Sequence, residues 1–204
     1  MLDRFLRPVI DPPLDRVGRW LARRGVSANG VTLAGLALGL AGAGAIALGA
    51  FGTGLALVLA SRLADGMDGA VARAGQATDF GGYLDIVADF VFYAAIPLGF
   101  VLWAPESNGI PGAALIAAFY VNAASFLGFA ILAEKHRLST DARGTKAWYH
   151  AGGLMEGTET IGFFVAFCLW PGAFAPLAWG FAALCLVTAL ARALQARALF
   201  SGQG

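Results

Sequence analysis

The sequence predicts an all-α integral membrane protein in which six transmembrane helices follow an amphipathic helix at the membrane interface. The first observation is composition: 58% of the 204 residues are hydrophobic, 13% are charged, and the mean hydropathy is +0.70. Such a chain is too apolar for an ordinary soluble domain. The second observation is that this length accommodates six spans of about 20 residues each. The third is that the basic residues are segregated to one set of connections.

The N-terminal segment, residues 1–25, combines apolar and basic positions. Apolar residues recur at helical spacing on both sides of a break at Pro12 and Pro13, and six arginines occupy much of the remainder. This pattern predicts an amphipathic, basic helix that lies in the headgroup region of anionic lipid. The alternative is a soluble helix that packs on the protein itself. The apolar positions are Leu2, Phe5, Leu6, Val9, Leu14, Val17, Trp20 and Leu21.

Six apolar segments follow, and the whole chain is predicted to form a single membrane domain over residues 1–204. The six-span bundle covers about residues 30–198, and the one long polar connection runs from Lys135 to His150. Four glycines in the first span are expected to allow close helix packing; they are Gly35, Gly39, Gly42 and Gly44. The spans are predicted at about residues 30–50, 53–73, 79–103, 110–134, 152–170 and 174–198.

The charge distribution predicts the orientation of the chain. Six spans place both termini on one side, and that side receives all fourteen Lys and Arg residues. The opposite connections carry only Glu106. By the positive-inside rule, the termini and the region from Asp65 to Asp89 face the cytoplasm. We therefore expect a protein integral to the cell (inner) membrane.

Five aspartates lie between positions 65 and 89, within predicted spans two and three. A carboxylate at the centre of a membrane helix costs ~2.5–3.5 kcal/mol, so such a group needs a function or a partner. The two spans are joined by a short link and must be antiparallel neighbours, so their acidic stripes face each other across one cavity. Asp79 lies off this pattern and is expected to cap the third span. The spacing is Asp65-x-x-Asp68-Gly69-x-x-Ala72-Arg73, seven residues, then Gly81-x-x-x-Asp85-x-x-x-Asp89.

Four carboxylates in one cavity indicate bound cations, because they would otherwise repel one another strongly. All-oxygen ligands suit Mg²⁺, Mn²⁺ or Ca²⁺ rather than zinc. Two ions about 3.5–4 Å apart are a known arrangement for in-line displacement at phosphorus. One alternative is a buried ion network, but the single nearby Arg73 cannot neutralise four aspartates. Another is an ion or proton pathway through the membrane.

The aspartate spacing resembles the signature of the CDP-alcohol phosphotransferase family, Asp-x-x-Asp-Gly-x-x-Ala-Arg followed by Gly-x-x-x-Asp-x-x-x-Asp, and every fixed position matches. The plan of an amphipathic N-terminal helix and six spans is also similar. The sequence Ala28-Asn29-x-x-Thr32 resembles the family's Pro-Asn-x-x-Thr entry to the first span, with Ala replacing Pro.

The resemblance implies a metal-dependent transfer of a phosphatidyl group from CDP-diacylglycerol to the hydroxyl of a small alcohol, with release of CMP. It also implies a homodimer and Mg²⁺ (or Mn²⁺) as cofactor, expected as two ions. Alternatives are a CDP-amino alcohol that donates to diacylglycerol, and a cation or proton transporter. No nucleic acid partner is expected. By resemblance, the metal ligands are Asp65, Asp68, Asp85 and Asp89, the general base is Asp89, and the nucleotide-binding residues are Asp65, Asp68, Gly69, Ala72, Arg73, Asn29 and Thr32.

The acceptor is indicated only by the remaining polar residues. Arg137, Arg143 and Lys146 bind the acceptor or lipid phosphates in one interpretation, and are ordinary positive-inside charges in the other. Glu156 and Glu159 in the fifth span would repel a phosphorylated acceptor and favour a cationic or neutral one. The alternative is that one of these glutamates pairs with a nearby basic residue. Elsewhere, in the fourth span, two polar residues are expected to form interhelical hydrogen bonds; they are Asn122 and Ser125.

Overall fold

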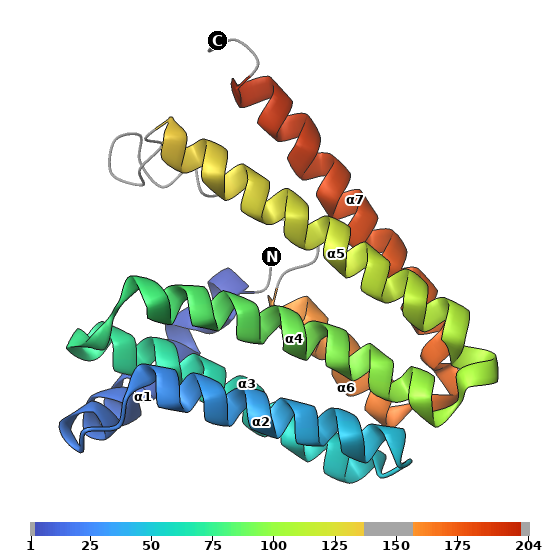
Figure 1. The fold of residues 1–204 in the computed structure, drawn as a ribbon, viewed down its shortest axis with the longest axis horizontal. Coiled ribbons are helices and arrows are strands. Elements are labelled where there is room, and N and C mark those ends of the chain that lie inside the picture. Colours follow the sequence, from blue (N-terminus) through green and yellow to red (C-terminus); the bar gives the residue numbers. More distant parts are fainter. Residues whose placement is uncertain (1–2, 137–156, 201–204) are drawn as a thin grey trace.

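The computed structural model describes residues 3–136 and 157–200, and this part of the chain is helical throughout, with short turns between the helices (Figure 1). Each of the six predicted spans corresponds to one helix, and the N-terminal segment forms another. The elements are α1 (Asp3–Arg23), α2 (Ala28–Ala47), α3 (Phe51–Val71), η1 (Ala72–Gln76), α4 (Asp79–Trp103), α5 (Pro105–Lys135), α6 (Gly157–Leu169), η4 (Pro171–Ala173) and α7 (Phe174–Phe200).

Four stretches of the described chain are long and apolar enough to cross a membrane. They support a membrane location, and neither α3 nor α6 is among them. Helix α3 carries Arg62, Asp65 and Asp68, and α6 is described over only 13 residues. Helix α1 continues across Pro12 and Pro13, so the expected break is wrong: a proline removes one backbone hydrogen bond without having to end the helix. The four stretches are Ala28–Ala47, Asp79–Trp103, Pro105–Lys135 and Pro171–Phe200.

Helices α2, α3 and α4 pack closely because glycines line one face of α2. A Cβ atom at Gly39 would lie 2.5 Å from Phe92 Cδ2, and one at Gly35 would lie 3.1 Å from Ala64 Cβ. Ser61 Oγ adds a hydrogen bond across the same interface by donating to the Gly35 carbonyl at 2.7 Å. The expected role in helix packing is therefore confirmed for Gly35 and Gly39, but it is wrong for Gly44, where nothing lies within 4 Å of an added Cβ atom.

The connection between α3 and α4 determines how their acidic residues meet. Within the π-helical turn η1, Gly75 has φ 112°, a backbone conformation that favours glycine. Thr78 has extended backbone angles, and its Oγ1 accepts a hydrogen bond from the Gly81 N–H at 3.0 Å. Thr78 is therefore the N-cap of α4, and the expectation of Asp79 was wrong. Asp79 lies in the first turn of α4, where a negative charge is favourable.

The hydrophobic core draws on helices α2 to α7, and its largest fully buried side chains are phenylalanines of α4, α6 and α7. Phe100 stacks on Phe174 with ring centroids 4.8 Å apart, and Phe163 stacks on Phe181 at 4.2 Å. Phe164 contacts Phe92 edge to face at 5.8 Å, which extends the cluster towards the acidic end of α4. The core thus fixes the part of α4 that follows its aspartates.

Helices α5 and α7 run side by side along much of their length (Figure 1). Their interface contains Arg192, which is 7% exposed. Its Nη1 donates to Asn122 Oδ1 at 3.0 Å and to Ser125 Oγ at 2.7 Å. The predicted role of Asn122 and Ser125 as interhelical hydrogen-bonding groups is therefore confirmed.

Candidate active site and metal centre

Three of the predicted aspartates converge between α3 and α4. Asp65 and Asp68 lie one helical turn apart on α3, and Asp85 faces them from the second turn of α4. One carboxylate oxygen from each residue lies within 4.8 Å of the other two. Asp68 is 5% exposed, whereas Asp65 and Asp85 are half-buried. The two acidic stripes therefore meet as their spacing predicted.

The buried carboxylate of Asp68 is oriented by the first turns of α2. The Thr32 hydroxyl donates a hydrogen bond to Asp68 Oδ2, and the two oxygens lie 2.6 Å apart. The same Thr32 Oγ1 lies 3.1 Å from the carbonyl oxygen of Ala28. Thr32 is itself buried. This contact gives Thr32 a defined place beside the three carboxylates.

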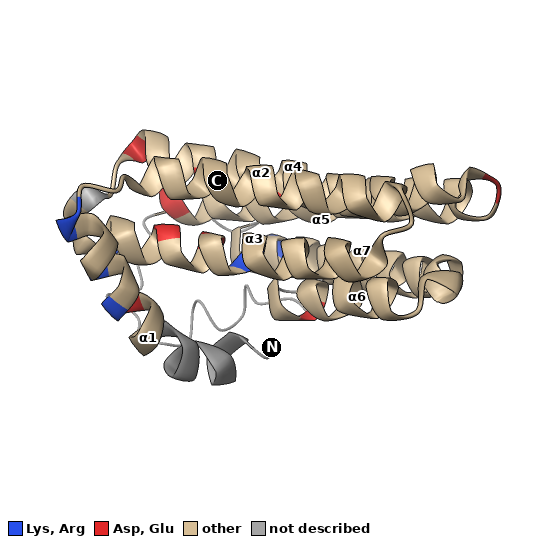
Figure 2. Ribbon diagram, turned by 90° about the horizontal axis from the view of Figure 1, so that it is seen from below, with Lys and Arg blue, Asp and Glu red and all other residues tan. Residues whose placement is uncertain are grey.

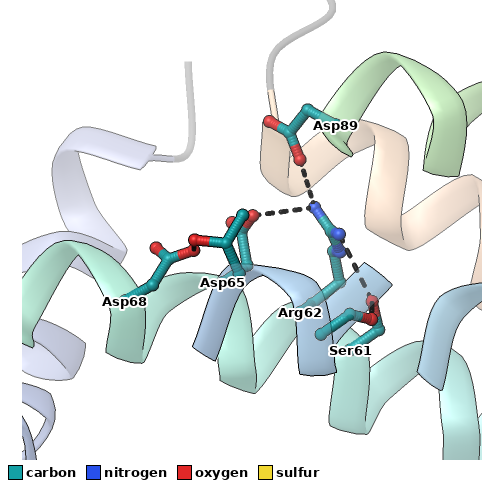
Figure 3. Close-up of polar contacts among 7 residues, drawn as sticks. Ser61, Arg62, Asp65, Asp68 and Asp89 are labelled. Atoms are coloured by element: carbon teal, nitrogen blue, oxygen red, sulfur yellow. Dashed lines mark hydrogen bonds and ion pairs between the residues drawn. The ribbon is translucent and has the colours of Figure 1, made fainter. Parts of the chain in front are cut away.

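Asp89 is held by an arginine rather than grouped with the other three aspartates (Figure 3). Arg62 Nη1 donates to Asp89 Oδ1 at 2.7 Å and lies 3.4 Å from Asp65 Oδ1. Since Arg62 belongs to α3 and Asp89 to α4, the ion pair joins the two helices. Sequence reasoning counted Arg62 only as a positive-inside charge. A usable signal was its position three residues before Asp65, on the same helical face.

The guanidinium of Arg62 is fixed on several sides. Its Cζ lies 3.7 Å from the centroid of the Phe92 ring, an arrangement that favours a cation. Its Nη2 donates to Ser61 Oγ at 3.3 Å (Figure 3). The Arg62 side chain is only 10% exposed. Arg62 is therefore a built-in positive charge within the acidic site.

The residues expected to line the nucleotide divide into two groups. Arg73 lies at the surface, where its Nη2 donates to Asp15 Oδ1 of α1 at 2.8 Å. Gly69 stands beside it, since a Cβ atom there would lie 3.3 Å from Arg73 Nη1. A cavity of about 230 Å³ adjoins Arg73. It is lined by Asp15, Arg19, Ala70, Arg73 and Ala74.

The second group lies where α2 and α4 begin. Asn29 Oδ1 would lie only 2.9 Å from a Cβ atom at Gly81, so the absence of a side chain at Gly81 allows this close approach. Thr32 follows one turn later on α2 and contacts Asp68. Ala72, the remaining small residue of the pattern, is half-buried at the start of η1.

The predicted acceptor residues are only partly within the described chain. Glu159 lies in the first turn of α6 and is half-buried. The other four lie outside the described residues; they are Arg137, Arg143, Lys146 and Glu156.

The three converging carboxylates fit a hard divalent cation. Oxygen ligands around Mg²⁺ at about 2.1 Å lie at most about 4.2 Å apart. The observed separations, within 4.8 Å, therefore need only small side-chain rotations to match. The donor set of Asp65, Asp68 and Asp85 is all oxygen, as Mg²⁺ and Mn²⁺ prefer.

The comparisons with known proteins agree with this arrangement. A family model described as CDP-alcohol phosphatidyltransferase matches residues 26–196. The inner membrane protein YnjF of Escherichia coli (strain K12) is 47% identical over 192 residues, which are 94% of this chain and 93% of YnjF. The archaetidylinositol phosphate synthase of Pyrococcus horikoshii is 35% identical over 99 residues, 48% of this chain and 52% of the synthase.

Solved structures show that the fold is also shared. The crystal structure of Mycobacterium tuberculosis phosphatidylinositol phosphate synthase with CDP-DAG bound has a TM-score of 0.71 and 23% identity, covering 90% of this chain and 93% of the synthase. The same enzyme in complex with manganese and citrate has a TM-score of 0.68 and 24% identity, covering 89% and 87%. The family match over most of the chain and the YnjF match decide the assignment: the protein belongs to the CDP-alcohol phosphatidyltransferase family, as a membrane transferase of substituted phosphate groups.

Proposed function

We propose that this protein transfers a phosphatidyl group from CDP-diacylglycerol to the hydroxyl of a small alcohol and releases CMP. The observation that carries the proposal is the convergence of Asp65, Asp68 and Asp85, with Asp89 one turn further along α4, in a chain of this family. The CDP-DAG bound to the M. tuberculosis synthase supports the choice of donor.

Asp65, Asp68 and Asp85 would hold the metal, Mg²⁺ or Mn²⁺, and two ions are expected, with Asp89 as a ligand of the second. The manganese complex of the M. tuberculosis synthase supports a divalent cation. When bound, such ions neutralise the diphosphate and stabilise the departing CMP. The protein contributes the carboxylates, held in place by Thr32 and by the packing of α3 on α4.

Asp89 is the proposed general base. The acceptor oxygen forms a bond to the phosphorus that carries the diacylglycerol, and the bond from this phosphorus to the CMP oxygen breaks. The bonding electron pair leaves with CMP, and the acceptor proton passes to Asp89. Asn29, Thr32, Gly69, Ala72 and Arg73 would bind the cytidine nucleotide. Small side chains at two of these positions leave room for it.

We further propose one membrane domain over residues 1–204, with α1 at the interface, six spans, and the termini and the site on the cytoplasmic side. The described basic residues of α1 and η1 gather at one end of the molecule, whereas the start of α5, whose first turn carries Glu106, lies at the other end (Figure 2). This separation is what the positive-inside rule requires. A homodimer is proposed from the family resemblance alone.

The acceptor is the part of the proposal that experiment must decide. The charges of Glu156 and Glu159 favour a neutral or cationic alcohol. The names of the P. horikoshii and M. tuberculosis synthases point instead to an inositol phosphate. Efficient use of a phosphorylated acceptor would show that the charge argument is wrong.

The test is CMP release by purified protein in detergent with CDP-diacylglycerol and Mg²⁺ or Mn²⁺. The acceptors would be inositol phosphate, inositol, glycerol 3-phosphate, serine, choline and ethanolamine. Acceptor-dependent CMP release that disappears in Asp89→Asn supports the proposal. Asp79→Asn is the matched control, because Asp79 is exposed on the same helix. No release with any acceptor, from protein shown to be folded, would reject this donor and direct the test to CDP-amino alcohols with diacylglycerol.

A further inference from the structure

We propose that Arg62 is an internal cation that holds Asp89 in the metal-free protein, so that divalent ions bind in sequence. The first ion binds at Asp65, Asp68 and Asp85, and the second binds only after Arg62 releases Asp89. This inference rests on the proposed function, since it concerns how the same site is loaded.

The contacts place Arg62 where a second ion would bind. A second ion about 3.5–4 Å from the first would share a carboxylate with it and use Asp89. Arg62 Nη1 already lies 2.7 Å from Asp89 Oδ1 and 3.4 Å from Asp65 Oδ1. The guanidinium and a divalent cation repel each other and compete for the Asp89 carboxylate. The contact between Arg62 and Asp89 therefore opposes binding of a second divalent ion at Asp89, and binding of that ion opposes the contact.

The guanidinium cannot leave this position without losing several contacts. The Phe92 ring lies against its face, and Ser61 accepts from Nη2 while donating to the Gly35 carbonyl. The pair is also poorly exposed, with 10% of the Arg62 side chain and 29% of the Asp89 side chain accessible. Screening by water is weak in such a place, so the charge-assisted hydrogen bond is stronger than one at the surface.

One atom of Arg62 indicates what would draw it away from Asp89. Arg62 Nε is buried and has no hydrogen-bond partner among the described residues. An unsatisfied buried donor is unfavourable, and a phosphate oxygen is a strong acceptor for a guanidinium. A diphosphate that enters the site would compete with Asp89 for Arg62. Binding of the nucleotide therefore promotes binding of the second ion.

The test is a Mn²⁺ titration of metal-free protein in detergent, followed by electron paramagnetic resonance, with CDP as the nucleotide probe. The wild-type protein is expected to bind one Mn²⁺ per chain without spin coupling, and a second, coupled Mn²⁺ only after CDP is added. Arg62→Gln is expected to bind two coupled ions without CDP. Its affinity for the second ion should rise about tenfold or more, because no charge-assisted hydrogen bond has to be broken.

Three variants serve as controls. Arg62→Lys keeps the positive charge and should retain the one-ion behaviour. Arg16→Gln removes the same charge from an exposed position on α1 and should match wild type. Adding Asp89→Asn to Arg62→Gln should abolish the second ion. The inference is overturned by two coupled ions in nucleotide-free wild type, or by Arg62→Gln binding only one.

Where Arg62→Gln fails to fold, the wild-type titration can still overturn the inference, because two coupled ions without CDP would contradict it. The outcome is also separable from the proposed function. Sequential Mn²⁺ binding without CMP release for any acceptor would reject transfer from CDP-diacylglycerol and leave the role of Arg62 intact. CMP release by a protein that binds both ions together would support the transfer reaction and reject the proposed role of Arg62.

Discussion

The two halves of α4 lie in opposite environments. The first half carries Asp85 and Asp89 and faces further carboxylates across the α3 interface. The second half carries Phe92, Ile96 and Phe100, each fully buried in the aromatic core. The first half brings like charges together, and the second half buries apolar side chains. A single helix thus connects the acidic cluster to the hydrophobic core.

This difference separates what stabilises the protein from what the site does. Packing around Phe100 stabilises the fold, whereas the aspartates repel one another unless a cation is present. Substitutions in the second half should therefore lower stability and leave metal binding intact. Substitutions of the aspartates in the first half should weaken metal binding and leave metal-free stability unchanged or higher. Phe92 lies at the boundary between the two halves of α4, because its ring contacts Phe164 and also packs against the Arg62 guanidinium.

The largest effect is expected from Phe100→Ala in the core half. Loss of a fully buried phenylalanine costs about 3–5 kcal/mol, because a cavity remains among its aromatic neighbours. Thermal unfolding in detergent measures the loss, and Mn²⁺ binding should persist in the fraction that remains folded. Leu102→Ala is the control, because Leu102 is 62% exposed and should change stability little. Equal losses for both variants would contradict a well-packed core.

Asp85→Asn tests the other half. CMP release should fall about 10²–10³-fold, as for removal of one group that stabilises charge in a transition state. Metal-free stability should stay the same or rise, because one of three mutually repelling carboxylates is neutralised. Parallel assays of CMP release and thermal unfolding check both. A clear fall in metal-free stability would mean that Asp85 is a structural residue.

Gly39→Ala acts at the boundary. Its Cβ would lie 2.5 Å from Phe92 Cδ2, so the ring must move and disturb the surface against which Arg62 rests. Overpacking of this kind costs about 1–3 kcal/mol. Gly44→Ala is the matched control, since nothing lies within 4 Å of its added Cβ. If both variants unfold at the same temperature as wild type, the packing of α2 on α4 is looser than described.

Thr32→Val is expected to have the smallest effect. It removes the 2.6 Å hydrogen bond to Asp68, a loss of about 1 kcal/mol. Mn²⁺ affinity should fall by about tenfold or less, because Asp68 keeps its charge but loses its orientation. Thr53→Val, at an exposed position of α3, controls for the substitution itself. Unchanged Mn²⁺ affinity in Thr32→Val would show that the contact has no part in metal binding.

Much of the fold followed from hydrophobic periodicity. The predicted span 79–103 coincides with α4, because its apolar run has clear polar limits. The fourth predicted span began at 110, but α5 begins at Pro105. Proline is favoured in the first helical turn, so the helix extends over polar residues that looked like a loop. Thr78 and Asp79 are both good capping residues, and only the backbone angles distinguish them.

The site was predictable where it depends on spacing along neighbouring helices. Asp65, Asp68 and Asp85 are placed by helical periodicity and one short link, and they do meet. The pairing of Arg62 with Asp89 is a contact between residues 27 positions apart, so no local pattern reveals it. The acceptor residues of the polar loop lie outside the described chain, and their role stays a prediction.

The described contacts around the aspartates also lie within a continuous part of the chain, from Ala28 to Tyr93. Ribosomal synthesis proceeds from the N-terminus, so these residues emerge before α5, α6 and α7 exist. Arg62 can neutralise Asp89 as soon as α3 and α4 form a hairpin, without any metal. A hairpin of α3 and α4 therefore compensates one carboxylate of the site before α5, α6 and α7 have been made.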